Sequence, residues 1–225
     1  MSLFAIADTH LSFASNKPMD DFEGWLNYTD RLKENWNKII DDKDYVVIAG
    51  DISWAMNFDE LKADFDYINQ LNGKKIILKG NHDYWWNTMS KMNKFIEENN
   101  FNTISILHNN AFDFDDFSVC GSRGWFFDSD EEQNEKVLNR EVMRIKASIE
   151  SALNCEKIVF LHYPPVYENQ CCEEIVSLLK EKGIKKCYYG HIHGVAAKYA
   201  FDDNYDGIDF KLISADRLDF MPLLI

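Results

Sequence analysis

Five of the six histidines in this 225-residue chain stand at the ends of short apolar runs, beside carboxylate and amide side chains. The motifs are Asp8-Thr9-His10, Gly50-Asp51, Gly80-Asn81-His82-Asp83, a single His162, and Gly190-His191-Ile192-His193. A mixed set of imidazole and carboxylate groups suits a divalent ion such as Mn, Fe, Zn or Ni better than Ca or Mg, which favour oxygen ligands. The sequence therefore predicts a metal site built from several distant segments.

Seven of these side chains are candidate metal ligands: Asp8, His10, Asp51, Asn81, His162, His191 and His193. Seven protein ligands are too many for one four-coordinate zinc ion, and they fit two ions that share one carboxylate. A purely structural role for all of them would require a separate partner for every buried imidazole and carboxylate, because unpaired buried polar groups are costly. The metal interpretation explains the five motifs together.

The apolar runs predict five strands, over residues 3–7, 45–49, 75–78, 157–161 and 187–189. Continuous hydrophobicity indicates strands covered on both faces, and helical periodicity over 25–39, 61–71 and 138–153 supplies the covering helices. Segments 104–125 and 195–225 contain short strand patterns broken by turn residues, and we expect hairpins there. Because α/β proteins bind ligands at the carboxyl ends of strands, the five motifs can converge on one crevice.

Composition limits the possible partners and compartments. The chain has 38 acidic and 24 basic residues and a formal charge of −14, which disfavours long nucleic acids because phosphate contacts need clustered Lys and Arg. No run approaches the ~20 apolar residues of a membrane span, and the first residues lack the features of a signal peptide. With five cysteines and no C-x-x-C motif, we expect reduced thiols, a cytoplasmic location, and one domain over residues 1–225.

In this order, the five motifs resemble the signature of the calcineurin-like metallophosphoesterases, and the resemblance extends over residues 3–195. It implies an α/β fold: a four-layer α/β/β/α sandwich of two mixed β-sheets flanked by helices, with a dinuclear metal site at one edge. It also implies that Asp8, His10 and His193 hold one ion, that Asn81, His162 and His191 hold the other, and that Asp51 bridges them.

The same resemblance implies a phosphohydrolase acting on a small phosphomonoester or phosphodiester, such as a nucleotide, through a hydroxide that bridges the metals. His82 would be catalytic together with Asp51, stabilising the phosphoryl oxygens or protonating the leaving oxygen. Asn81 and His82 would also contact the substrate, and Asp83 would support the loop. The signature does not distinguish a monoesterase from a diesterase, and the sequence indicates no oligomeric state.

The second motif departs from that of the protein phosphatases in this superfamily, because Gly50-Asp51-Ile52-Ser53-Trp54 lacks their Asp-Arg pair. Arg123 is a replacement candidate for binding phosphate, since its planar fork suits that group; the alternative is a surface ion pair. The aromatic residues beside the motifs either wall a pocket or pack in the core. They are Trp54, Tyr84, Trp85 and Trp86.

Two other functions remain open at this point. A metal-dependent nuclease acting on short nucleic acid would use the same ligands, although the chain lacks a basic groove. A non-catalytic scaffold of the same fold would need neither the ligands nor His82, and this chain retains both. We therefore expect an enzyme whose partner is a small phosphate ester, with no membrane partner.

Overall fold

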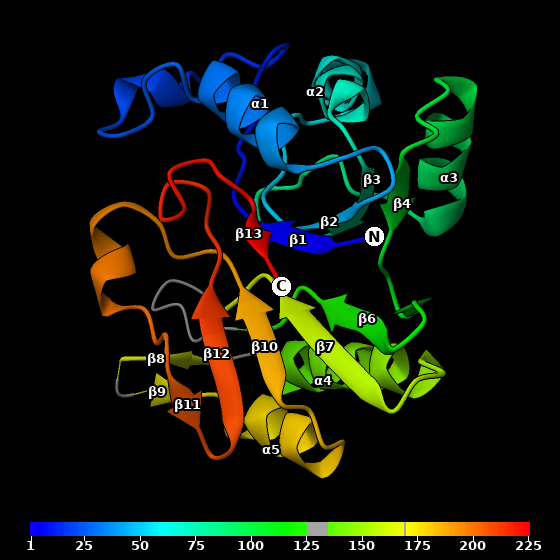
Figure 1. Cartoon of the computed structure of the whole chain (residues 1–225), viewed down its shortest axis with the longest axis vertical. Coiled ribbons are helices and arrows are strands. Elements are labelled where there is room, and N and C mark those ends of the chain that lie inside the picture. The colour runs from blue at the N-terminus through cyan, green and yellow to red at the C-terminus, as the bar shows by residue number, and fades with distance from the viewer. Residues whose placement is uncertain (126–134, 169) are drawn as a thin grey trace.

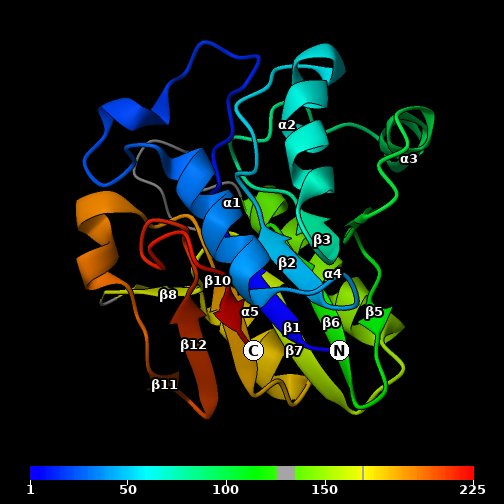
Figure 2. The same cartoon turned by 45° about the horizontal axis from the view of Figure 1, so that its top comes forward.

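The computed structural model describes residues 1–125, 135–168 and 170–225. Two mixed β-sheets pack against each other, and helices cover the outer face of each sheet (Figures 1 and 2). This arrangement is the predicted α/β/β/α sandwich with two mixed sheets flanked by helices. Within the described residues, no helix is long and apolar enough to cross a membrane.

The first sheet has the strand order β13-β1-β2-β3-β4. Strands β1 to β4 run parallel, and β13 joins β1 in the antiparallel direction. The bounds are β1 (Leu3–Ile6), β2 (Tyr45–Ala49), β3 (Lys74–Leu78), β4 (Ile104–Ile106) and β13 (Leu223–Leu224). Its outer face is covered by α1 (Tyr28–Ile39), α2 (Phe58–Gln70) and α3 (Met89–Glu98).

The second sheet has the order β11-β12-β10-β7-β6-β5, with its four inner strands parallel and both edge strands antiparallel. The bounds are β5 (Phe112–Asp113), β6 (Phe117–Ser122), β7 (Glu156–Leu161), β10 (Lys186–Tyr189), β11 (Asn204–Tyr205) and β12 (Ile208–Leu212). Its outer face is covered by α4 (Glu135–Ser151) and α5 (Glu173–Glu181). Minor elements are η1 (Met19–Asp21), η2 (Gly194–Tyr199), β8 (Val166–Tyr167) and β9 (Gln170–Cys171).

Alternation along the strands divides the apolar side chains between separate cores. In β1, Phe4 and Ile6 pack against the helices, whereas Leu3 and Ala5 face the second sheet. Phe160 of β7 enters the core between the sheets from the other side. Because each fully buried large apolar side chain contributes roughly 1.5–3 kcal/mol, this shared core holds the two sheets in a defined relation.

The five predicted strands are all present, and β2 has the predicted bounds. The prediction of hairpins was wrong in two places. In segment 104–125, β4 pairs in parallel with β3, and only β5 and β6 form an antiparallel pair. In segment 195–225, β11 and β12 form a hairpin, but η2 is helical and β13 returns to the first sheet. Local periodicity marks a strand without indicating which sheet it joins.

Candidate metal centre

The carboxyl ends of five parallel strands meet at one edge of the two sheets. Asp8 and His10 follow β1, and Asp51 follows β2. The motif that begins at Gly80 follows β3, His162 follows β7, and the last motif follows β10. Residues from both sheets therefore come together here, as the sequence predicts from the placement of its motifs.

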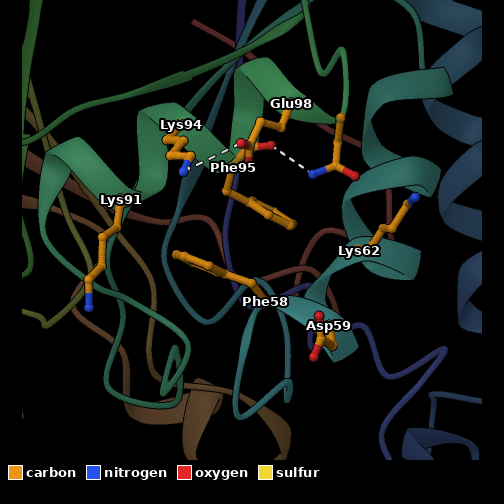
Figure 3. A pocket seen from close by; sticks show the side chains of 8 residues that line it. Phe58, Asp59, Lys62, Lys91, Lys94, Phe95 and Glu98 are labelled. Atoms are coloured by element: carbon orange, nitrogen blue, oxygen red, sulfur yellow. Dashed lines mark hydrogen bonds and ion pairs between the residues drawn. The ribbon is translucent and has the colours of Figure 1, made fainter.

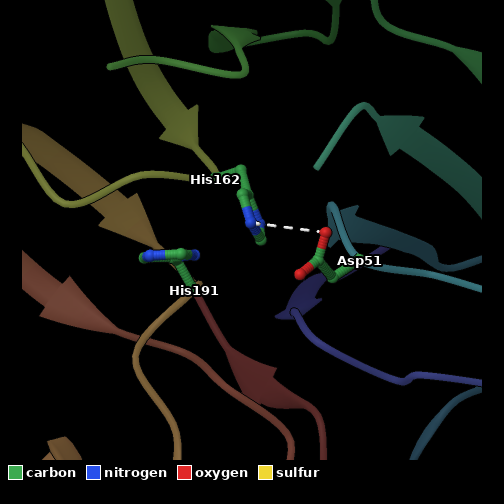
Figure 4. Close-up of side chains that lie close together, drawn as sticks. All are labelled: Asp51, His162 and His191. Atoms are coloured by element: carbon green, nitrogen blue, oxygen red, sulfur yellow. Dashed lines mark ion pairs between the residues drawn. The ribbon is translucent and has the colours of Figure 1, made fainter. Parts of the chain in front are cut away.

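Asp51 is at the centre of this cluster and is almost fully buried. One of its carboxylate oxygens lies 3.4 Å from His162 Nε2, and the other lies 3.8 Å from His10 Nε2 and 4.0 Å from His82 Nε2. Figure 4 shows Asp51 facing His162, with His191 beside them. The same carboxylate thus belongs to two groups of side chains that could hold a metal ion.

The first group is formed by Asp51, His162 and His191, with Asn81 between the two histidines. Asn81 Oδ1 lies 2.6 Å from His162 Nε2 and 3.0 Å from His191 Nδ1. His162 Nδ1 lies 3.1 Å from the carbonyl of Ala49, which can only accept, so Nδ1 carries the proton in the neutral ring. The lone pair of Nε2 then faces the oxygens of Asn81 and Asp51, and a cation fits among these three acceptors.

The second group is formed by Asp8, His10 and Asp51. His10 is buried, and neither of its ring nitrogens has a hydrogen-bond partner among the described residues. Leaving a buried polar group unpaired costs about 1–3 kcal/mol, and an ion bound by one of these nitrogens would satisfy it. The imidazole of His193 stands edge-on to that of His10, with 5.3 Å between ring centroids. His193 is therefore placed beside this group.

The electrostatics favour the ligating forms of three of these side chains. Burial lowers the pKa of His10 to about 3, and burial together with the charge of His162 lowers the pKa of His191 to about 3. Burial alone would raise the pKa of Asp51, but His162, His10 and His82 hold that pKa well below its usual range. Neutral imidazoles and an ionised carboxylate are the forms that bind metal ions. Burial alone would lower the pKa of His162, but the charges of Asp51 and Asp8 raise that pKa to about 9, so a bound ion would displace a proton from its ring.

Four candidate ligands have left-handed backbone conformations, which residues other than glycine rarely adopt. The φ angles are 57° at Asp8, 43° at His10, 49° at Asp51 and 72° at His191. Such conformations cost of the order of 1 kcal/mol or more each, and they gather at functional sites. Sequence motifs alone did not predict this strain.

Gly80 allows two of the loops to approach closely. A Cβ atom at this position would lie 2.1 Å from Asp51 Oδ1 and 2.2 Å from the backbone nitrogen of Asp51. No side chain larger than hydrogen fits there without moving the central carboxylate. The glycine that precedes Asn81 is therefore required by the position of Asp51 and is more than a turn former.

Asp83, for which the sequence suggested only a supporting role, is fully buried and ties the loops together. Its Oδ2 accepts hydrogen bonds from the backbone nitrogens of Asp51 at 3.0 Å and Gly80 at 2.7 Å. Its Oδ1 accepts from the nitrogen of Ile52 at 2.9 Å and from Trp85 Nε1 at 3.2 Å. Burial and the charge of Asp51 raise the pKa of Asp83. One carboxylate thus holds the segments after β2 and β3 in register.

The aromatic residues beside the motifs divide between the site and the core. Trp54 stacks on the ring of His10 at 4.8 Å and lies 4.4 Å from that of His82, so it walls the site. Tyr84 is half exposed, and its hydroxyl lies 3.1 Å from His82 Nδ1. Trp85 is buried in the core under the first sheet. Trp86 lines a different cavity.

Arg123 is not part of the ligand cluster. Its backbone carbonyl accepts hydrogen bonds from the nitrogens of His162 and Tyr163, at 3.1 and 2.9 Å. Its guanidinium lies over the ring of Tyr163, 5.7 Å from the centroid, and lines the same cavity as Trp86. Among the described residues it makes no ion pair, and its role in binding phosphate stays a prediction.

A cavity of about 490 Å³ lies between α2 and α3 (Figure 3). Phe58 and Phe95 stack across it with 4.6 Å between ring centroids, and exposed lysines and acids surround them. It contains none of the five motifs. The size of a cavity therefore does not indicate where the chemistry of this protein takes place.

The layered fold brings together a carboxylate that is shared between two histidine-containing groups, each of which could hold a metal ion. The profile of the family described as calcineurin-like phosphoesterase matches residues 1–195, and the chain belongs to that family. Divalent metal ions are the cofactor that this family and the Asp/His cluster indicate.

Other similar proteins add information on the fold. An uncharacterised protein of Methanocaldococcus jannaschii is 34% identical over 86 residues, a match that spans 36% of this chain and 46% of that protein. The phosphopantetheinyl hydrolase of Mycobacterium tuberculosis superimposes with a TM-score of 0.57 at 14% identity, over 100% of this chain and 95% of that one. A protein of unknown function from Aquifex aeolicus gives 0.52 at 15% identity, over 99% and 95%. At these identities the two solved structures show the shared fold alone.

Proposed function

We propose that this chain is a dinuclear metal-dependent phosphohydrolase that hydrolyses a small phosphomonoester or phosphodiester, such as a nucleotide. The observation that carries the proposal is the position of Asp51, whose two carboxylate oxygens face separate groups of histidines. His82, which is not needed in either group, stands 4.0 Å from the same carboxylate. A ligand set of this kind with a further histidine beside it suits phosphoryl transfer to water.

The proposed ligands of one ion are Asp8, His10 and His193, and those of the other are Asn81, His162 and His191. Asp51 is the proposed bridge. The oxygen of Asn81 between two imidazoles and the unpartnered nitrogens of His10 support this division among the described residues. The nitrogen and oxygen donors suit Mn, Fe, Zn or Ni.

When bound, two divalent ions neutralise charge on the phosphoryl oxygens and lower the pKa of the attacking water. The protein's own side chains then position the ester. Because Asn81 Oδ1 faces the histidines, its amide nitrogen is available to donate to a phosphoryl oxygen. The hydroxyl of Tyr84 lies against Nδ1 of His82 and orients the ring, so that Nε2 can deliver a proton to the leaving oxygen.

Two variants test these roles. His82→Ala should keep the metal content of the wild type and lose about 10²- to 10⁴-fold in turnover of an alkyl phosphate, whose leaving group needs protonation. The loss should be smaller with 4-nitrophenyl phosphate, whose leaving group is a weak base. Asp51→Asn should lower the metal content itself. Elemental analysis and phosphate release measure both effects, and full activity of His82→Ala on the alkyl ester would exclude its proposed role.

A small substrate and a cytoplasmic location are also part of this proposal. The net charge of −14 opposes long polyanions, and salt-insensitive or absent binding of oligonucleotides would favour a small ester over the nuclease alternative. All five cysteines are free thiols, which supports a reducing compartment. Turnover of aryl phosphate, aryl phosphodiester and cyclic nucleotides would distinguish a monoesterase from a diesterase.

A further inference from the structure

A second cavity, of about 310 Å³, lies beside the metal centre and is lined by basic side chains. Lys79 follows β3, His108 lies just beyond β4, and Arg123 follows β6, so the ends of three strands from the two sheets form its frame. Arg144 of α4 and the ring of Trp86 also line this cavity. Neither the family signature nor the proposed metal ligands account for this cavity.

The cavity carries excess positive charge. Arg144 pairs with the fully buried Glu141 at 2.6 Å, and the hydroxyl of Ser122 donates to the other oxygen of Glu141 at 3.0 Å. Among the described residues, neither Lys79 nor Arg123 makes an ion pair. Three cations therefore surround this cavity, while Glu141 pairs with Arg144 and the charge of Asp83 acts on Lys79, so positive charge remains in excess in a protein whose net charge is −14.

This charge distribution is unfavourable without an anion. Burial lowers the pKa of His108, and the charges of Arg144 and Lys79 lower it further against the opposing effect of Glu141. The Nε atom of Arg123 is buried and has no hydrogen-bond partner among the described residues. Like charges held around a small cavity repel one another, and a buried guanidinium nitrogen without an acceptor is costly. A bound anion would relieve both costs.

The cavity and the metal centre share two structural connections. Lys79 directly precedes Gly80 and Asn81, so β3 supplies residues to both sites. Arg123 follows β6, which pairs with β7, and its carbonyl accepts the backbone hydrogen bond of His162. The two sites are therefore joined through β3 and through the backbone hydrogen bond between Arg123 and His162.

We propose that this basic pocket binds a second phosphate group of the substrate, separate from the phosphate that is hydrolysed. The proposal rests on the proposed function and narrows the substrate class to small organic bisphosphates. Arginine forks bind phosphate in a bidentate manner, and lysine adds a point charge. A phosphate group carries up to two negative charges, so it offsets more of the positive charge of three cations than a singly charged carboxylate would.

A series of α,ω-alkanediol bisphosphates tests the proposal and measures the separation of the two sites. For each chain length, kcat/KM of the metal-loaded protein is compared with that of the alkyl monophosphate of the same length. The non-hydrolysable bisphosphonates and monophosphonates are compared by calorimetry, which gives Kd independently of turnover. At the optimal length we expect a preference of about tenfold or more for the doubly charged compound, as one charge-assisted phosphate contact provides.

Variants assign the preference to the pocket. Lys79→Met should reduce it to about threefold or less, since one of three cations is lost. Arg144→Met would leave Glu141 buried without its partner, so the double variant Glu141→Gln/Arg144→Met removes the pair together. Arg140→Met is the matched control, because Arg140 is exposed on the same helix. Circular dichroism and the melting temperature establish that each variant is folded.

The outcomes separate this proposal from the proposed function. Turnover of monophosphates with no bisphosphate preference at any length, or equal preference in wild type and Lys79→Met, would overturn the pocket while leaving the phosphohydrolase. Tight, Lys79-dependent binding of a bisphosphonate without turnover of any ester would support the pocket and count against the hydrolase. If Arg140→Met loses the preference as strongly as Lys79→Met, the effect comes from overall charge, and the pocket proposal fails.

Discussion

Replacing Asp83 with asparagine is the most direct test of how the loops of the metal centre are held. The change keeps the shape of the side chain and removes one acceptor. Oδ2 receives the backbone N–H groups of Asp51 and Gly80, and Oδ1 receives those of Ile52 and, at 3.3 Å, Ser53. In either orientation of the amide, its NH₂ group meets at least two N–H donors and can accept from neither.

The expected loss follows from these contacts. Two buried donors left unsatisfied cost about 1–3 kcal/mol each, and the removal of the repulsion between Asp83 and Asp51 offsets part of that cost. We therefore expect a loss of about 3 kcal/mol in the free energy of unfolding of the metal-free protein. For a chain of this length, that loss lowers Tm by roughly 6–12 °C. Because the carboxylate of Asp51 at the centre of the cluster is no longer held, metal affinity should fall by about 10- to 100-fold.

The assay combines calorimetric melting with and without chelator and a metal titration followed by elemental analysis. Asp66→Asn serves as the matched control, because Asp66 is exposed on α2 and the chemical change is identical. If Asp83→Asn melts within about 1 °C of the control and binds metal with wild-type affinity, the hydrogen bonds of Asp83 do not organise the site, and the reasoning is refuted.

Three further predictions concern Gly80, the buried Lys75 and the bound ions. Gly80→Ala should lower the metal content, since its Cβ would lie 2.1 Å from Asp51 Oδ1; stoichiometric metal by elemental analysis would contradict this. Burial lowers the pKa of Lys75 to about 8 against about 10.4 when unfolded, so the unfolded chain binds more protons between these values. Between about pH 8 and pH 10.4, the difference in the free energy of unfolding between wild type and Lys75→Met should therefore rise by up to about 1.4 kcal/mol per pH unit. If denaturant titrations show that this difference does not change with pH, the effect is excluded. Chelation should lower Tm, with recovery on adding Mn²⁺, because ions that bind only the native state at 100 times Kd contribute about 2.7 kcal/mol; equal Tm values would count against a metal site.

The fold could be predicted to the level of its layers. Uninterrupted apolar runs identify the inner strands, because only strands covered on both faces need them, and β2 was predicted to the residue. The short edge elements were not predictable, because β4, β5 and β13 contain only two or three residues each and take their partners from the assembled sheets. The interpretation of residues 1–225 as one domain stays a prediction, supported by the core shared between the sheets.

For the site, the sequence by itself determined which residues can act as ligands. Asp, Asn and His are the only side chains in the five motifs with suitable donors, and the end of an apolar strand is recognisable from a few neighbouring residues. This local information places His10, Asp51 and His162 at the carboxyl ends of strands before any contact between the sheets is known.

Only the tertiary structure decided how those residues are used. The hydrogen bond between His191 and Asn81 joins positions 110 apart, and that between His191 and Asp8 joins positions 183 apart. Such pairs depend on how two sheets pack, which no local pattern encodes. The central place of Asp51 and the gathering of Lys79, Arg123 and Arg144 around one cavity arise in the same way, because charge and coordination act through space, and the folded chain alone sets those distances.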